Sequence, residues 1–164
     1  MKILLIILPV FLFLVNKSDA KMTFEIGRIN MDTAVNAEKD IRNSLQLWND
    51  AAKERDIEKA MSLFDDSENI LLVGSDSGEI CKGKEQISKW LKMLFDYASF
   101  SWELDRVDID YSGNTAWVFT EGKMVVTPSN GKTRKVPYRF TGILVKRNNV
   151  WKWRLFNGSN PRPE

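Results

Sequence analysis

Few residues of this sequence could do chemistry, and their types narrow the reactions at once. The chain has no histidine and a single cysteine, Cys81. Without an imidazole, Ser-His-Asp and Cys-His catalysis and histidine-based metal sites are excluded. One thiol cannot build a thiolate zinc site or an internal disulfide, so Cys81 is either buried and inert or links two chains. Any reaction here would use carboxylates, tyrosine, lysine, arginine or bound water, and we expect neither a metal nor a cofactor.

One carboxylate stands in an apolar strand pattern. Trp117, Phe119 and Glu121 have the same parity, so they share one face of the strand. If that face is interior, a carboxylate enters an apolar cavity, where it must be paired, hydrated or neutral. Arg134 and Arg139, in the next strand pattern, are the candidate partners. Glu121 is therefore a weak candidate for a catalytic acid with a raised pKa, and the alternative is a position on the rim or outer face.

The last strand pattern ends in a polar group. The residues of this strand alternate between two faces: one face carries Trp151, Trp153, Leu155 and Asn157, and the other carries Lys152, Arg154 and Phe156. If these four residues face inward, Asn157 forms the polar end of a pocket wall. The alternative is a turn role, because the sequence Asn-Gly-Ser-Asn-Pro that begins at Asn157 is typical of turns. The six tryptophans of the chain fill a core in one interpretation, and two or three of them line a pocket in the other.

The N-terminal residues 1–20 have the composition of a signal peptide. An apolar run from Ile3 to Val15 follows Lys2, and small residues at Ser18 and Ala20 fit a peptidase site, so we expect cleavage after Ala20. The alternative is a membrane anchor, which fits less well because the run is short for a bilayer. The prediction is a secreted or periplasmic protein that has no membrane contact once the signal is removed.

The remainder is long enough for one domain with its own core. Residues 21–32 read as a lead-in and 161–164 as a tail. A helix is expected from the cap at Asp32-Thr33, because an apolar stripe repeats at helical spacing. The stripe contains Ala37, Ile41, Leu45, Trp48 and Ala52. Asp56 predicts the N-cap of a short second helix.

A hairpin, a third helix and four strands are expected next. The run at 69–73 and the residues at 79–82 flank the turn signal Ser75–Gly78, and Gly83-Lys84 opens the third helix. Turn signals at 112–114, 128–131 and 148–149 then separate four long strands, which predicts an antiparallel meander in an α+β fold. In the first of these strands the inward parity changes near Asp105-Arg106, so a β-bulge is expected there that bends the sheet around a helix and leaves a cavity.

Four phrases of the sequence, in this order, resemble the nuclear transport factor 2-like superfamily, and within it the SnoaL-like and ketosteroid-isomerase-like exported domains. They are LWNDAAKERDIEKAMSLF, GEICKGKEQISKWL, GNTAWVFTEG and VWKWRLFNGS, within residues 41–159. The resemblance implies a conical fold over residues 33–160, in which three N-terminal helices pack in a strongly bent, mainly antiparallel sheet with an apolar pocket. It also implies a homodimer formed through the outer face of the sheet.

The catalytic groups of ketosteroid isomerases are not matched here. Their first-helix tyrosine corresponds to Trp48, and their aspartate base falls near Leu72. The strand that would carry their protonated acid offers Tyr138, Arg139 and Thr141. The His-x-His pair found on the last strand of many SnoaL-like relatives is replaced by Leu155 and Asn157.

We therefore predict a binding domain for a small apolar or amphipathic molecule, without catalysis. The expected pocket residues are Trp48, Trp117, Phe119, Glu121, Tyr138, Arg139, Trp153 and Asn157. Two alternatives stay open: a carboxylate-based isomerase, lyase or hydrolase acting through Glu121, and an interaction module that uses the outer sheet face. The formal net charge of +2 gives no electrostatic reason to expect nucleic acid or an anionic membrane as a partner.

Overall fold

The computed structural model describes residues 17–161, with side chains from residue 36 onward. The apolar run from Ile3 to Val15, expected to form a signal peptide, lies outside these residues. One compact unit of the described residues begins at Ala37. Within the described residues, no helix is both long and apolar enough to cross a membrane.

The long helix α1 runs from Lys17 to Glu54 and so begins earlier than the Asp32-Thr33 cap predicted from the sequence. No proline interrupts residues 17–31, so nothing there forces the helix to stop. The predicted apolar stripe is confirmed: all five of its residues are buried, with Ile41 at 0% and Trp48 at 3% exposure. Because this stripe faces the sheet, the C-terminal half of α1 forms the centre of the core.

The short elements that follow α1 match the predicted hairpin and helices. Asp56 is the N-cap of helix α2 (Ile57–Ser62), and its carboxylate accepts a hydrogen bond of 2.9 Å from the backbone N–H of Lys59. Strands β1 (Leu71–Val73) and β2 (Ile80–Lys82) pair antiparallel, and helix α3 (Gly83–Tyr97) follows directly. The apolar side of α3 is buried through Ile87, Leu91 and Phe95.

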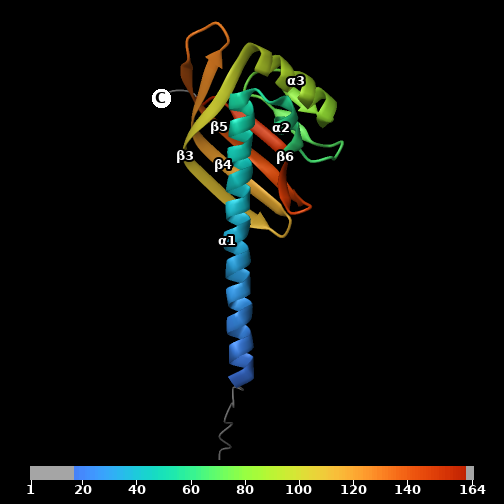
Figure 1. The fold of residues 1–164 in the computed structure, drawn as a ribbon, viewed down its shortest axis with the longest axis vertical. Helices are drawn as coiled ribbons and strands as arrows, with labels where there is room; N and C mark the ends of the chain where they lie inside the picture. Colours follow the sequence, from blue (N-terminus) through green and yellow to red (C-terminus); the bar gives the residue numbers. More distant parts are fainter. Residues whose placement is uncertain (1–16, 162–164) are drawn as a thin grey trace, which may run out of the picture. The chain divides into compact units, whose positions relative to one another are not determined.

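Four long strands complete a six-stranded sheet (Figure 1). They are β3 (Ala98–Ser112), β4 (Thr115–Pro128), β5 (Arg134–Arg147) and β6 (Val150–Ser159), joined as the predicted antiparallel meander. Strand β1 pairs in parallel with β6, giving the order β2-β1-β6-β5-β4-β3. The prediction of an α+β fold with helices packed in a bent, mainly antiparallel sheet is confirmed.

The bulge predicted in the first long strand is present. The pairing of β3 with β4 shifts register between Leu104 and Arg106, which leaves Asp105 without a partner residue. As a result Trp102, Leu104 and Val107 all pack against the core despite their different parity. Gly122 of β4 lies opposite, where a Cβ atom would be 2.1 Å from the carbonyl oxygen of Glu103. The missing side chain of Gly122 is what allows the bulged backbone to come this close.

A second bulge, in β6, was not predicted. Ile143 pairs with Leu155 and Leu144 pairs with Trp153, so Arg154 is the extra residue. Its guanidinium donates a hydrogen bond of 2.6 Å to the carboxylate of Asp65, which is only 2% exposed and also accepts one of 3.1 Å from Arg147. Burial raises the pKa of Asp65, but the bonds from Arg147 and Arg154 outweigh it and leave the pKa below its ordinary value.

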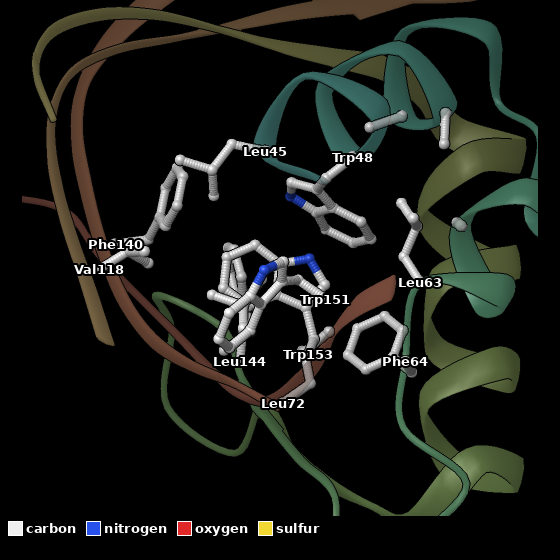
Figure 2. Close-up of a cluster of buried hydrophobic side chains, with 14 of the residues drawn as sticks. Leu45, Trp48, Leu63, Phe64, Leu72, Val118, Phe140, Leu144, Trp151 and Trp153 are labelled. Carbon is white, nitrogen blue, oxygen red and sulfur yellow. The ribbon is translucent and has the colours of Figure 1, made fainter. Parts of the chain in front are cut away.

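The core lies between α1 and the concave face of the sheet. Figure 2 shows Trp48 of α1 pointing toward Trp153 of β6, and their ring centroids are 6.5 Å apart. Phe64 meets the edge of Trp48 at 5.7 Å, and Phe140 stacks on Phe156 at 5.0 Å. This aromatic packing fills one end of the space under the sheet.

Candidate ligand-binding cavity

The other end of the concave face holds a cavity of about 520 Å³ that is open to solvent on one side. Helices α1 and α3, the β1–β2 hairpin and strands β3 to β6 all contribute to its wall. This volume lies in the range of small-molecule sites, which are mostly apolar with a few polar groups. The lining residues are Trp48, Ala52, Leu72, Gly74, Ser75, Asp76, Glu79, Trp90, Leu91, Leu94, Phe95, Tyr97, Phe100, Trp102, Met124, Val126, Arg134, Val136, Pro137, Tyr138, Phe156, Asn160 and Pro161.

Aromatic rings from a helix and a strand make one wall of the cavity. Trp48 of α1 stacks on Trp102 of β3, with centroids 5.9 Å apart and planes inclined by 22°. The strand is tied to the helix at this point, because the Trp102 backbone N–H donates a hydrogen bond of 2.7 Å to Asn49. Trp90 and Phe95 of α3 contribute further rings. Flat apolar surfaces on different elements favour a flat apolar ligand.

Tyr138 of β5 supplies a polar group to the cavity wall. The residue is 5% exposed, and its hydroxyl forms no hydrogen bond with any residue of the described range 17–161. Burial raises the pKa of this phenol, and the nearby carboxylates of Glu79 and Asp76 raise it further. The hydroxyl therefore stays protonated at neutral pH and can donate a hydrogen bond.

Two glycines on neighbouring strands make room for the polar groups. A Cβ on Gly158 of β6 would lie 1.9 Å from the Tyr138 hydroxyl oxygen, and one on Gly74 would lie 2.1 Å from Glu79 Oε2. Val73 and Asn157, the residues just before these glycines, are partners in the parallel β1–β6 pairing. The carboxylate of Glu79 and the phenol of Tyr138 thus lie over adjacent glycines of the sheet. Glu79 Oε2 also accepts a hydrogen bond of 3.0 Å from the backbone N–H of Asp76.

Three predicted pocket residues lie on the opposite face of the sheet. The buried side of β4 carries Ala116, Val118 and Thr120, so Trp117, Phe119 and Glu121 point to the convex side. Trp117 is 48% exposed, and none of these three lines the cavity. The predicted partner Arg139 is indeed paired in register with Glu121, but on the convex face. The expectation of a carboxylate entering the cavity from β4 is therefore corrected.

The bulge in β6 corrects the expected polar end of the wall. Trp151 and Trp153 face inward as predicted, but the extra residue Arg154 reverses the parity beyond it. Phe156 is consequently buried and lines the cavity, whereas Asn157 is exposed on the convex side. Trp153 is 0% exposed and belongs to the core and not to the cavity wall. Of the predicted pocket residues, Trp48 and Tyr138 line the cavity.

Sequence reasoning missed the residues that the β1–β2 hairpin and α3 bring to the cavity. Asp76 belongs to the turn signal Ser75–Gly78 and Glu79 directly follows it, and a turn signal by itself indicates only a surface loop. The helical spacing of apolar residues in α3 could have indicated that Trp90 and Leu94 face the interior. Both are only partly buried in the structure and line the cavity. Within residues 17–161, no group of histidine, cysteine, aspartate and glutamate residues has the arrangement of a metal site.

The fold, with its bent sheet around a long helix, is that of the nuclear transport factor 2-like superfamily. Its sequence also matches the SnoaL-like domain over residues 41–163, and the chain belongs to that family. The resemblance predicted from four short phrases is thereby confirmed. No curated protein matches the sequence.

Solved structures with this fold share little sequence with the chain. A proposed dehydratase of the NTF2-like family from Streptomyces avermitilis is 15% identical, with a TM-score of 0.70 over 80% of this chain and 99% of its own. A proposed scytalone dehydratase from Novosphingobium aromaticivorans is 14% identical, with a TM-score of 0.71 over 80% and 89%. An NTF2-like superfamily protein from Salmonella enterica is 17% identical, with a TM-score of 0.70 over 79% and 94%. At these identities the likeness shows the fold alone.

Proposed function

We propose that this domain binds a small, mainly apolar molecule in the cavity under its sheet and does not transform it. The observation that carries the proposal is the cavity of about 520 Å³ walled by Trp48, Trp90, Trp102 and Phe95. Burying apolar ligand surface against such walls contributes roughly 25 cal/mol per Å² before the cost of ordering the ligand. Binding without catalysis is supported by the absence of histidine from the sequence and by the position of Glu121 on the convex face.

Native mass spectrometry of the chain, produced through an export pathway, tests the proposal. We expect a small molecule to be retained with the folded protein and released on denaturation. The variant Met124→Trp should lose the retained mass, because Met124 lines the cavity and a larger ring would occupy it. The matched control is Met93→Trp, since Met93 is 58% exposed on α3 and does not line the cavity. Equal retention by both variants, or none by the unaltered chain, would contradict the proposal.

A carboxylate-based enzyme is the second candidate. With Glu121 outside, the group that supports this candidate is Glu79, which lines the apolar cavity together with Tyr138. The protonated phenol could donate a proton or a hydrogen bond while the carboxylate accepts one. Incubating the protein with any molecule it retains distinguishes the two functions. Recovery of that molecule unchanged supports binding without catalysis. Its conversion to a product by the unaltered chain, but not by Glu79→Gln, would establish an enzyme.

The convex face supports a further proposal, a homodimer. An apolar row crosses this face from β4 to β1, through residues that are register partners on successive strands: Trp117, Ile143, Leu155 and Leu71. None of the four is fully buried in the single chain. In size-exclusion chromatography with light scattering, we expect the unaltered chain to have the mass of a dimer. We expect the variant Trp117→Lys to have the mass of a monomer. A monomeric unaltered chain would refute the dimer and leave the face free for another protein.

Export is the last element of the proposal and rests on residues 1–20 alone. Cleavage after Ala20 would remove the first four residues of α1, which begins at Lys17. N-terminal sequencing of the protein recovered from the medium or periplasm should give Lys21 as its first residue. An intact Met1 in the recovered protein would contradict cleavage.

A further inference from the structure

We propose that Tyr138 and Glu79 form a subsite for a hydroxyl group, so that the cavity selects an uncharged apolar alcohol or phenol. The inference rests on the proposed binding function and names the class of ligand. It is carried by Gly158 of β6 and by Gly74, the residue just after β1, because the Tyr138 hydroxyl lies over the first and the Glu79 carboxylate over the second. The residues just before these glycines, Asn157 and Val73, are register partners.

The two side chains offer complementary hydrogen bonds. Tyr138 is 5% exposed, and its hydroxyl makes no hydrogen bond to any described residue, so it has a donor free for a ligand. Glu79 Oε2 accepts one bond from the backbone at 3.0 Å, and a carboxylate can accept several more. No hydrogen bond joins the phenol to the carboxylate in the described residues, so both groups keep hydrogen-bonding capacity for a ligand. A ligand hydroxyl can accept from Tyr138 and donate to Glu79 at the same time.

The charges around the subsite disfavour a carboxylate ligand. Asp76 and Glu79 both line the cavity; Asp76 is exposed and screened by water, so the partly buried Glu79 is the main source of repulsion for a ligand carboxylate. Arg134 also lines the cavity, but it lies at the start of β5, paired in register with Val126, and is solvent-exposed. Its charge is therefore better screened by water than that of the partly buried Glu79. A neutral hydroxyl avoids the repulsion and still satisfies both protein groups.

The test compares three probes of one shape against the full chain by equilibrium dialysis: naphthalene, 2-naphthol and 2-naphthoate. We expect 2-naphthol to bind about tenfold more tightly than naphthalene, the gain of one or two net hydrogen bonds. We expect 2-naphthoate to bind at least about tenfold more weakly than 2-naphthol, because its charge meets Glu79. Tyr138→Phe should remove most of the advantage of 2-naphthol and leave naphthalene binding within about twofold. Glu79→Gln should strengthen 2-naphthoate binding at least about threefold by removing the repelling charge.

The matched controls are Tyr111→Phe and Glu121→Gln, which make the same chemical changes away from the cavity lining. Neither should alter the ranking of the probes. Equal binding of naphthalene and 2-naphthol, unchanged in Tyr138→Phe, would overturn the hydroxyl subsite and leave the apolar cavity function standing. Tightest binding of 2-naphthoate would also overturn it and point to Arg134. If none of the three probes binds, both the subsite and the proposed binding function fail.

Discussion

The contact between Gly158 and Tyr138 gives a prediction whose size can be worked out from the structure. A Cβ added at Gly158 would lie 1.9 Å from the Tyr138 hydroxyl oxygen, 2.8 Å from Cζ and 3.5 Å from Cε1. Atoms cannot approach to 1.9 Å, and Tyr138 is 5% exposed, so its ring has little room to move away. Overpacking of this kind costs about 1–3 kcal/mol. We expect Gly158→Ala to lower the free energy of unfolding by that amount and to weaken 2-naphthol binding.

The hydroxyl carries most of this clash, which makes the prediction specific. In a Tyr138→Phe background the nearest remaining atom would be Cζ at 2.8 Å. The cost of Gly158→Ala should therefore be about 1–2 kcal/mol smaller in that background, and this difference is the coupling between the two changes. Tyr138→Phe alone should change stability little, because the hydroxyl has no protein partner to lose.

Urea unfolding followed by far-ultraviolet circular dichroism measures the four free energies of this double-mutant cycle. Gly131→Ala is the control: its Cβ would be 3.2 Å from Pro128 in an exposed turn, where a small gain from a less flexible unfolded chain is expected. If Gly158→Ala costs the same with tyrosine or phenylalanine at position 138, within about 0.5 kcal/mol, then Tyr138 does not lie over Gly158 as described, and the subsite loses its basis.

Three further predictions concern the supporting structure. Asp65→Asn should cost about 1–3 kcal/mol at pH 7, reduced by the partial exposure of Arg147 and Arg154. The pKa of Asp65 in the folded protein is below its ordinary value of 3.8, so its stabilising contribution is fully present above pH 3.8 and is lost as the pH falls through the folded pKa. The urea midpoints of the unaltered protein and Asp65→Asn should therefore converge in acid. Cys81 is 7% exposed, and its pKa is raised mainly by burial and also by the charge of the Glu79 carboxylate. A disulfide reagent should therefore modify Cys81 slowly until urea unfolds the chain. Gly122→Ala should cost more than about 2 kcal/mol in urea, because the new Cβ would lie 2.1 Å from a β3 carbonyl oxygen, and a cost below about 0.5 kcal/mol would contradict the bulge geometry.

The elements of the fold could be predicted from the sequence because each depends on neighbouring residues. Helical spacing located the buried stripe of α1, and Asp56 marked the start of α2 by its capping chemistry. The change of parity near Asp105 predicted the β3 bulge, since only an extra residue could bring both apolar sets to one face. The turn signals separated the four strands of the meander. These patterns act over a few residues, so one sequence is enough to detect them.

The faces of β4 and the end of β6 could not be predicted in the same way. Trp117 and Phe119 are as apolar as the residues beside them, so alternation alone allowed either face to be the inner one. The outcome follows from the register with β3 and β5, which is a property of the assembled sheet. In β6, the bulge at Arg154 accompanies its bond to Asp65, a residue far away in the sequence. The extra residue of this bulge places Phe156 inside and Asn157 outside.

The sequence by itself determined the element types, the fold class and the exclusion of imidazole chemistry, because composition and periodicity are local properties. Only the tertiary structure decided which polar groups reach the cavity. The Glu79 carboxylate and the Tyr138 phenol reach one cavity because β1 pairs in parallel with β6, which places Val73 opposite Asn157, the residues just before Gly74 and Gly158. Pairing between strands so distant in the chain is fixed by the packing of the whole domain, which no stretch of residues encodes alone.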